Sequence, residues 1–563
     1  MKIKSLLLIS TLLLVISCTD LDLNPLSEGS SENWYSNETE ISMAVNDLYR
    51  PVFWPLEDGE WTDDYTRRQA LTPITSATIN GEWETLQNLW LNSYKTIARA
   101  NTILLNLDKV SEILPPATID KFAGNAHFVR AAQYAKLIFY YGDVVFYTNI
   151  IDIDEAFTLS RTSKAEVLAA IYADYDAAAS KLPIAYGNAE NKLATKGAAL
   201  AMKARIALAM GDWAIARDAA KACMDLGIYE LYPDYGELFL AKTKNPKELV
   251  FGLPRSKEFG VLWEMVNYYL PRNVGGFGGS IAPSWDLFHS FLCTDGLPID
   301  KSPLYNPQKP FKNRDPRCTA TIVEFGTPWL GFIYEPHPDS LKVLNVNTGQ
   351  RVKNNDTRGN QQYASFNGLV WKKFADESWL PDFKAENDKM FMRYADVLLM
   401  YAEAKIELNE IDQSVLDAIN KVRARAYKVS YTATSSYPAV GTGSQSQLRT
   451  TVRVERRMEF AHEGLRYQDI IRWKIAEKVL NQDIYGMLDV AALRTKIVKP
   501  GLWFFPMTPA IDENGSPNLL PMYEAGLIKL LADRQFDASK QYLWPIPTKE
   551  ILINKNLIQN PGY

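Results

Sequence analysis

The spacing of apolar residues between Trp83 and Leu226 predicts a series of amphipathic α-helices. Apolar side chains recur there every three or four positions, which places them on one face of a helix. Proline and glycine interrupt this pattern at intervals typical of helix ends. The interruptions fall at Pro115-Pro116, Gly142-Asp143, Pro183 and Gly211-Asp212. We therefore expect this part of the chain to be almost entirely helical.

Small residues indicate how these helices pack against one another. The two helices of a tetratricopeptide hairpin cross closely where side chains are small, as they are at Ala204, Gly211, Ala216 and Cys223. Further helices of such pairs are predicted at Phe128 to Tyr141, Lys164 to Leu182, Arg393 to Leu408 and Asp417 to Ala426. The fold class expected is mainly α, with a tetratricopeptide-like helical repeat scaffold, long irregular loops and a few short strands.

The middle of the chain, from Tyr229 to Lys389, lacks helical periodicity and is rich in Gly, Pro and aromatic residues. Short strands are expected at Glu248 to Leu253 and at Gly368 to Phe374. Two later stretches, Tyr427 to Gln447 and Gly501 to Lys540, also look irregular. We divide the chain into an N-terminal helical region at 18–230, a loop-rich region at 231–390 that contributes to a ligand site, and a C-terminal helical region at 391–563.

The first seventeen residues have the layout of an export signal. Lys2 and Lys4 precede an apolar run that is too short to span a membrane as a helix. The run ends at Val15-Ile16-Ser17-Cys18, which looks like a bacterial lipobox, so residues 1–17 are predicted to be a lipoprotein signal peptide and Cys18 the site of lipid attachment. The alternative is an ordinary cleaved signal with an incidental cysteine.

Composition and charge are those of a globular protein that does not bind nucleic acid. The 563 residues are 47% hydrophobic and 23% charged, with a net charge of -5. Removal of Lys2 and Lys4 with the signal gives -5 - 2 = -7, which disfavours general affinity for phosphate backbones. The cysteines after Cys18 allow at most one disulfide, for which Cys293 and Cys318 are the candidates.

The sequence carries no motif of a common catalytic site. Its four histidines lack the spacing of a zinc-protease helix, and there is no Gly-x-Ser-x-Gly elbow or phosphate-binding loop. The string Gly275 to Gly279 is read as a flexible loop near a surface site. No metal or cofactor is expected. A carboxylate pair for glycoside hydrolysis stays open, because the separation that matters is spatial.

Short strings in a constant order over nearly the whole chain carry a resemblance to a known family. They include Leu21-Asp22-Leu23-Asn24-Pro25, Arg99-Ala100-Asn101, Tyr141-Gly142-Asp143, Asp295-Gly296-Leu297-Pro298-Ile299, Arg314-Asp315-Pro316-Arg317, Arg393-Tyr394-Ala395-Asp396, Glu455-Arg456-Arg457-Met458-Glu459-Phe460 and Trp544-Pro545-Ile546-Pro547. In these strings the chain resembles the SusD/RagB family. The resemblance implies a lipid-anchored, non-catalytic protein at the cell surface that captures glycan and passes it to a SusC-like TonB-dependent transporter of the outer membrane.

Most residues in these strings are expected to build the scaffold. Charged side chains persist inside a helical bundle only when they are paired. We therefore predict structural ion pairs for Arg393, Glu403, Glu455, Arg456, Arg457 and Glu459. Trp90, Trp213, Trp473 and Trp544 are expected in the core, and the prolines after Trp544 fit a tail laid across the helices.

A glycan site needs aromatic faces for pyranose rings together with polar groups for hydroxyls. The polar, loop-like stretch Pro51 to Gly81 and the residues just after it supply the first candidates, which are Trp61, Tyr65, Arg67, Arg68 and Trp83. The resemblance adds a second zone before Asp295-Gly296, where the candidates are Tyr268, Tyr269 and Phe277. The alternatives left open are a glycoside hydrolase and a peptide-binding or protein-binding tetratricopeptide adaptor.

Overall fold

The structure, a computed structural model, describes residues 34–55, 59–187 and 193–563. The predicted signal peptide and Cys18 lie outside these residues. Within the described part of the chain, no helix is both long and apolar enough to cross a membrane.

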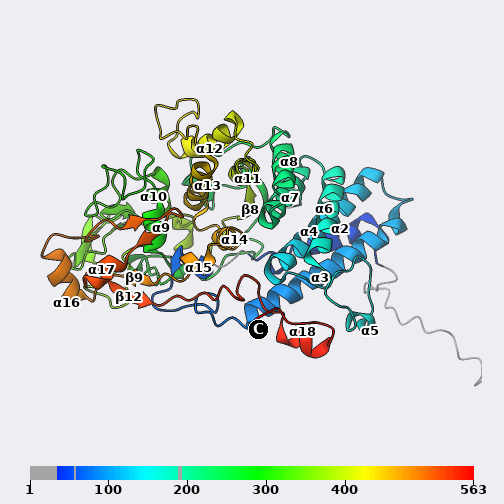
Figure 1. Cartoon of the computed structure of the whole chain (residues 1–563), viewed down its shortest axis with the longest axis horizontal. Helices are drawn as coiled ribbons and strands as arrows, with labels where there is room; N and C mark the ends of the chain where they lie inside the picture. Colours follow the sequence, from blue (N-terminus) through cyan, green and yellow to red (C-terminus); the bar gives the residue numbers. More distant parts are fainter. Residues whose placement is uncertain (1–33, 56–58, 188–192) are drawn as a thin grey trace, which may run out of the picture.

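The N-terminal half is a layered set of helices, shown in blue and cyan in Figure 1. Consecutive long helices pack side by side, α3 on α4, α4 on α6, α6 on α7 and α7 on α8. The bounds are α2 (Glu38–Asp47), α3 (Glu84–Asn106), α4 (Pro116–Tyr141), α5 (Ile153–Ala156), α6 (Lys164–Lys181), α7 (Lys196–Met210) and α8 (Trp213–Met224). The predicted helical pattern and its breaks are confirmed.

Local chemistry explains where these helices begin and end. Pro116 opens α4, where a missing N–H costs nothing. Ser163 and Thr195 cap α6 and α7 by accepting hydrogen bonds from backbone N–H groups. Gly142 and Gly211 end α4 and α7 with positive φ angles of 75° and 84°, which glycine adopts without strain.

The helical layer continues into the C-terminal half, because α11 packs on α8. Around it lie α12, α13 and α14, with α15 beside α14. The short helices α9, α10, α16 and α17 lie on the side away from the N-terminal helices, and α18 lies beside those helices (Figure 1). The bounds are α9 (Trp285–Ser290), α10 (Pro316–Thr321), α11 (Tyr394–Glu407), α12 (Gln413–Ala426), α13 (Gln445–Phe460), α14 (Arg466–Arg472), α15 (Ala476–Val479), α16 (Val490–Leu493), α17 (Leu520–Glu524) and α18 (Thr548–Ile553). The predicted hairpin of two helices from Arg393 onward is confirmed as α11 and α12.

The strands form small antiparallel sheets. Among the described residues, four of these sheets are two-stranded, and they pair β1 (Tyr65–Thr66) with β3 (Ala282–Pro283), β2 (Leu249–Leu253) with β8 (Lys389–Arg393), β9 (Ile484–Gly486) with β12 (Lys529–Ala532), and β10 (Ala510–Ile511) with β11 (Pro517–Asn518). The largest is a four-stranded meander of β4 (Thr327–Trp329), β5 (Phe332–Tyr334), β6 (Lys342–Asn345) and β7 (Gln350–Lys353).

The strand predictions for the middle region were partly wrong. The strand expected at Glu248 to Leu253 is confirmed as β2. The strand expected at Gly368 to Phe374 is absent from this described segment, in which only Trp371 makes an isolated bridge, to Ile322. The meander of β4 to β7 was missed, because strands of three or four residues separated by Gly and Pro do not show a clear alternation.

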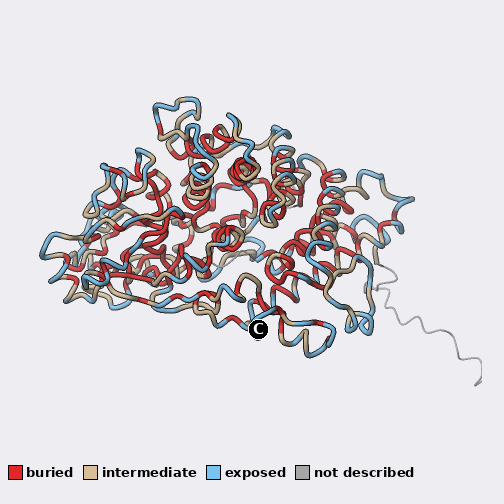
Figure 2. The backbone as a smooth tube through the Cα atoms, in the orientation of Figure 1, coloured by how far each residue is buried: buried red, intermediate tan, exposed pale blue. Residues whose placement is uncertain are grey.

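Buried residues, red in Figure 2, run through both halves, and apolar side chains among them form the core clusters. Trp90, Trp473 and Trp544 are buried as predicted, whereas Trp213 is only partly buried. The C-terminal tail lies across the N-terminal helices, since the backbone N–H of Trp544 donates to the carbonyl of Tyr140 at 2.7 Å. The tail prediction is therefore confirmed.

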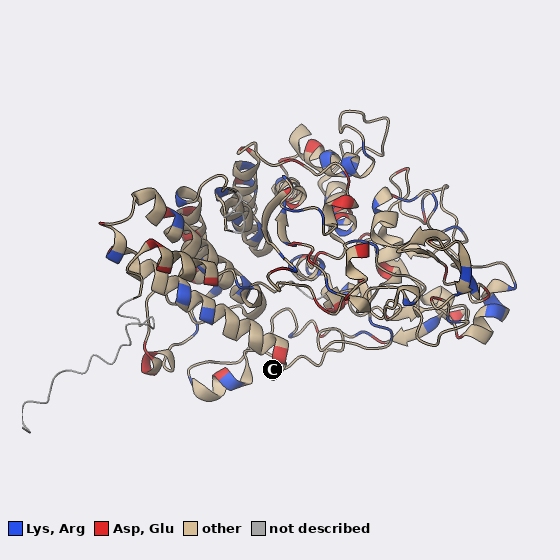
Figure 3. Ribbon diagram, turned by 180° about the vertical axis from the view of Figure 1, so that it is seen from behind, with Lys and Arg blue, Asp and Glu red and all other residues tan. Residues whose placement is uncertain are grey.

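Charged residues of both signs are interspersed over both halves (Figure 3), and a subset is buried in networks of ion pairs. Arg456 pairs with Asp396 at 2.6 Å, and Arg423 pairs with Glu455 at 2.8 Å. The residues predicted to form structural ion pairs are all buried and all paired, in three separate networks: Arg393, Glu455 and Glu459 in the first, Glu403 and Arg456 in the second, and Arg457 in the third. That prediction is confirmed.

The cysteines do not form the candidate disulfide. Cys223, Cys293 and Cys318 are free and buried. Cys318 packs in the core cluster around α9, and Cys293 lies in the loop that follows this helix. The pairing of Cys293 with Cys318 is therefore corrected, because each of the two buried side chains is a free thiol.

Candidate functional site

The site begins with a short loop that buried ion pairs fix in place. Asp63 and Asp64 are buried at its start, where Asp63 pairs with Arg466 at 2.8 Å and Asp64 pairs with Arg457 at 2.8 Å. Burial alone would raise the pKa of Asp63, but Arg457 and Arg466 outweigh it and hold this pKa well below its usual range. Asp63 therefore stays charged and anchors the loop to Arg466 in α14 and to Arg457 near the end of α13.

Strand pairing then joins this loop to the second predicted zone. Tyr65 in β1 lies opposite Pro283 in β3, and the backbone N–H of Ser284 donates to the carbonyl of Asp64 at 2.9 Å. Because β1 leads into Arg67 and Arg68, the pairing brings these arginines beside the residues that precede β3.

An open cavity of about 620 Å³ lies where the two zones meet. We call it the arginine–aromatic cavity. Its walls are formed by Arg67, Arg68, Gln69, Ala70, Tyr268, Arg272, Phe277, Ser280, Tyr363 and Phe366. Four predicted site residues, separated by about two hundred positions in the chain, therefore line one space.

Contacts between the arginines and the rings shape this cavity. Arg68 Nη2 donates to the carbonyls of Phe277 at 2.9 Å and Tyr363 at 3.1 Å. The Tyr268 and Phe277 rings meet edge to face with centroids 4.9 Å apart, and the Arg67 guanidinium lies 5.7 Å from the Tyr268 ring. Phe277 and Tyr363 remain 40% and 51% exposed, so their faces are open to a ligand.

The glycine-rich string that carries Phe277 is held by its backbone. The N–H of Phe277 donates to the carbonyl of Asn267 at 2.8 Å, and that of Gly278 donates to Leu270 at 3.1 Å. A Cβ on Gly278 would approach the Arg272 side chain to 2.7 Å, and its φ angle is +70°. Glycine therefore allows the chain to turn tightly against Arg272, which fixes Phe277 at the rim.

Other predicted site residues lie elsewhere. Tyr65 is 8% exposed and hydrogen-bonds to His462. Tyr269 is half-buried against His462 and Trp263, and it lines a separate cavity of about 330 Å³ together with Tyr65. Neither ring faces the arginine–aromatic cavity.

Trp61 and Trp83 belong to an aromatic cluster at the start of α3. Trp61 is 5% exposed and meets Trp83 at 5.6 Å and Trp544 at 5.3 Å between ring centroids. Trp83 lies directly before α3 and is half-buried against the same Trp544 ring. These two tryptophans therefore pack the C-terminal tail onto the helices, in a position that the polar sequence around Trp61 does not reveal.

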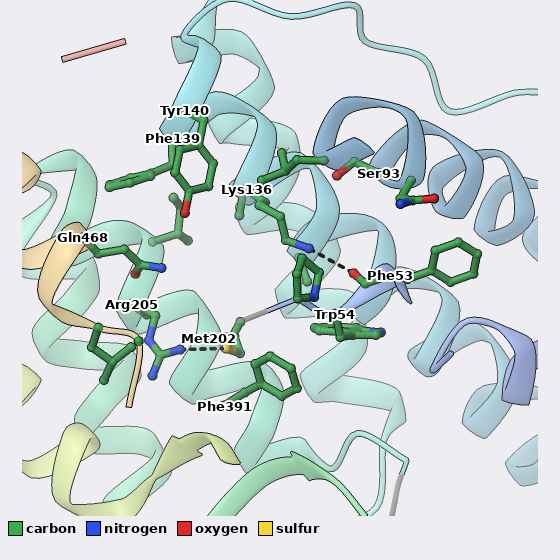
Figure 4. A pocket seen from close by; sticks show the side chains of 18 of the residues that line it. Phe53, Trp54, Ser93, Lys136, Phe139, Tyr140, Met202, Arg205, Phe391 and Gln468 are labelled. Atoms are coloured by element: carbon green, nitrogen blue, oxygen red, sulfur yellow. Dashed lines mark hydrogen bonds between the residues drawn. The ribbon is translucent and has the colours of Figure 1, made fainter. Parts of the chain in front are cut away.

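A third cavity, of about 570 Å³, lies between the N-terminal helices and Phe391, as Figure 4 shows. Its walls are mostly aromatic and aliphatic, and three cations approach it. Lys136 donates to the carbonyl of Phe53 at 3.0 Å, Lys389 to that of Trp54 at 2.5 Å, and Arg205 to Asp396 at 2.6 Å. Each of these cations is held by a group of the protein. We take the arginine–aromatic cavity as the candidate site because predicted residues from both zones line it.

Metal binding has no support in the described residues, among which no cluster of three or more His, Cys, Asp and Glu side chains could hold an ion. His462 stacks on Trp371 with ring centroids 4.2 Å apart. Burial lowers its pKa to about 3, so this ring is neutral at physiological pH.

Fold and site together define a class, a helical-repeat protein with long loops that build an aromatic and basic surface cavity. The SusD family model matches residues 263–563, and a model described as "Starch-binding associating with outer membrane" matches residues 38–208. The chain belongs to the SusD family.

Individual relatives extend over nearly the whole chain. A SusD-like protein of Formosa agariphila is 25% identical over 599 aligned residues, with 100% of each chain covered. A solved SusD-like carbohydrate binding protein from Bacteroides fragilis has a TM-score of 0.76 at 29% identity and covers 93% of this chain and 99% of its own. A laminarin binding SusD-like protein has a TM-score of 0.59 at 19% identity, covering 94% and 100%.

Proposed function

We propose that the chain binds glycan at the arginine–aromatic cavity. The observation that carries this proposal is the meeting of Arg67 and Arg68 with the Tyr268 and Phe277 rings around one open space. Aromatic faces stack on the apolar side of sugar rings, and guanidinium groups donate to hydroxyl oxygens. Two solved relatives, described as carbohydrate binding and laminarin binding, support the same class of ligand.

Capture without bond cleavage is the second part of the proposal. Glycoside hydrolysis requires two carboxyl groups facing the scissile bond. The described residues that line the cavity include neither Asp nor Glu, which favours binding over hydrolysis.

The third part concerns location and partner. A lipid attached to Cys18 anchors the protein at the cell surface, on the outer membrane, and the captured oligosaccharide passes to a SusC-like TonB-dependent transporter. The description of the model matching residues 38–208, which places starch binding in association with the outer membrane, supports this location.

Calorimetry against a panel of polysaccharides tests the proposal, with release of reducing ends assayed in the same samples. The chain from residue 19 onward retains every described element. We expect binding without release. Alanine at Tyr268 or Phe277 should weaken binding about two- to tenfold, since ring contacts contribute about 0.5–1.5 kcal/mol beyond burial.

The matched control is Phe259→Ala, because Phe259 is 78% exposed in the same irregular region but does not line the cavity. If both cavity variants bound glycan with unchanged affinity, the proposal that this cavity is the binding site would be wrong. Release of new reducing ends would replace capture by hydrolysis.

A further inference from the structure

The arginine–aromatic cavity is strongly basic in a protein that is acidic overall. Arg67, Arg68 and Arg272 all line it, and no Asp or Glu is among its described wall residues. The whole chain has a net charge of -5. The basic character is therefore local, and such a concentration of one sign favours ligands of the opposite sign.

Protein groups neutralise these arginines only in part. Arg67 lies 3.6 Å from Glu60, with 48% of its side chain exposed. Arg68 Nη2 donates only to backbone carbonyls, and Arg68 Nε is buried with no hydrogen-bond partner in the described part of the chain. The Arg68 guanidinium also lies 5.2 Å from the Tyr363 ring and 5.6 Å from the Phe366 ring, neither of which carries a formal negative charge. Burial, together with the positive charge of Arg272, lowers the pKa of Arg68.

The carboxyl group behind Arg272 gives little compensation either. Asp356 Oδ1 accepts a hydrogen bond from the backbone N–H of Arg272 at 2.5 Å. Burial raises the pKa of Asp356 to about 7, so this group carries only part of a negative charge near neutral pH. An anion entering the cavity would supply the missing charge.

We propose that the ligand of this cavity is an acidic glycan, whose carboxylate or sulfate groups bind Arg67, Arg68 and Arg272 while its sugar rings stack on Tyr268 and Phe277. Arginine suits this task because its planar fork donates two parallel hydrogen bonds to such anions. This inference rests on the proposed function and narrows it from glycans in general to charged ones.

Pairs of polysaccharides that differ only in charge provide the test. Polygalacturonate is compared with its fully methyl-esterified form, and carrageenan with its desulfated form, by calorimetry at two salt concentrations. We expect the charged member of at least one pair to bind at least tenfold more tightly, and salt to weaken that binding. The pair that responds distinguishes a carboxylate ligand from a sulfate ligand.

Arginine variants assign the effect to the cavity. Arg67→Gln and Arg272→Gln should each weaken binding of the charged polysaccharide by roughly tenfold, the loss expected for one charge-assisted hydrogen bond. Arg50→Gln is the control, because Arg50 is 57% exposed and lies outside the cavity. Thermal unfolding of each variant verifies that it is folded.

The outcomes separate the two proposals. Equal affinity for charged and neutral partners would overturn the acidic ligand and keep glycan binding. An equal loss of affinity in Arg50→Gln would show attraction to the surface in general and would also overturn it. If no polysaccharide bound measurably, the proposed function itself would be overturned.

Discussion

Replacing Glu459 by glutamine tests whether the buried ion pairs around this residue stabilise the protein. Glu459 is fully buried at the end of α13, where it pairs with Arg393 at 3.1 Å, with Arg317 at 3.2 Å and with Arg425. Glutamine keeps the shape of the side chain but removes its charge and turns an N–H₂ group toward the guanidinium groups. The arginines are then left with too little negative charge in a buried site.

The structure gives the size of the effect. Burial alone would raise the pKa of Glu459, but Arg425, Arg393 and Arg317 outweigh it and hold the pKa at about 2. An unfolded glutamate has a pKa of about 4.3, so the carboxylate contributes roughly 3 kcal/mol at neutral pH. Breaking a buried ion pair costs about 3–5 kcal/mol in general, which agrees with this value.

Differential scanning calorimetry measures the loss. The entropy of unfolding is about 2.1 cal/mol/K per residue, or roughly 1.2 kcal/mol/K for 563 residues unfolding together. A loss of about 3 kcal/mol therefore lowers Tm by about 3 °C, and by more if the C-terminal half unfolds alone.

The control is Glu410→Gln. Glu410 pairs with Arg217 at 2.6 Å, but the two side chains are 42% and 26% exposed. A pair in such contact with water contributes at most about 1 kcal/mol. Equal Tm shifts in the two variants would refute the reasoning, since burial would then not matter to the strength of the pair.

Two further predictions concern acid and thiols. Because the folded pKa of Glu459 lies below the unfolded value, the stabilisation by this carboxylate is complete above about pH 4.3 and is lost as the pH falls toward 2. As the pH is lowered, Tm should therefore fall less steeply for Glu459→Gln than for the unchanged protein. Parallel curves of Tm against pH would contradict this. When the chain from residue 19 onward is denatured without reductant, iodoacetamide should alkylate all three cysteines, Cys223, Cys293 and Cys318. Two cysteines that resist alkylation would reveal a disulfide.

The long helices could be predicted because their signals are local. The apolar period and the breaks at Pro116, Gly142 and Gly211 are all visible within a few residues. The meander of β4 to β7 was missed because its short strands are stabilised by pairing with one another and leave little periodicity in the sequence.

The candidate site could be predicted only in part, because some of its residues are brought together only by the tertiary fold. Arg67, Arg68, Tyr268 and Phe277 stand out by residue type and by position relative to motifs, and the structure brings them together. Tyr363 and Phe366 were missed, since they lie in no motif and reach the cavity only through the tertiary fold. The burial of Trp61 likewise depends on the distant Trp544 ring.

Because β1 pairs with β3, the arginine–aromatic cavity forms only when two distant parts of the chain have folded together. Arg68 and Phe277 are 209 positions apart, and they belong to segments matched by different family models. Closing so long a loop is slow compared with forming a helix, so the cavity comes into being only after both halves have docked. A partly synthesised or partly folded chain therefore lacks the proposed site, and we expect ligand added during refolding to stabilise only molecules in which the two halves have already met.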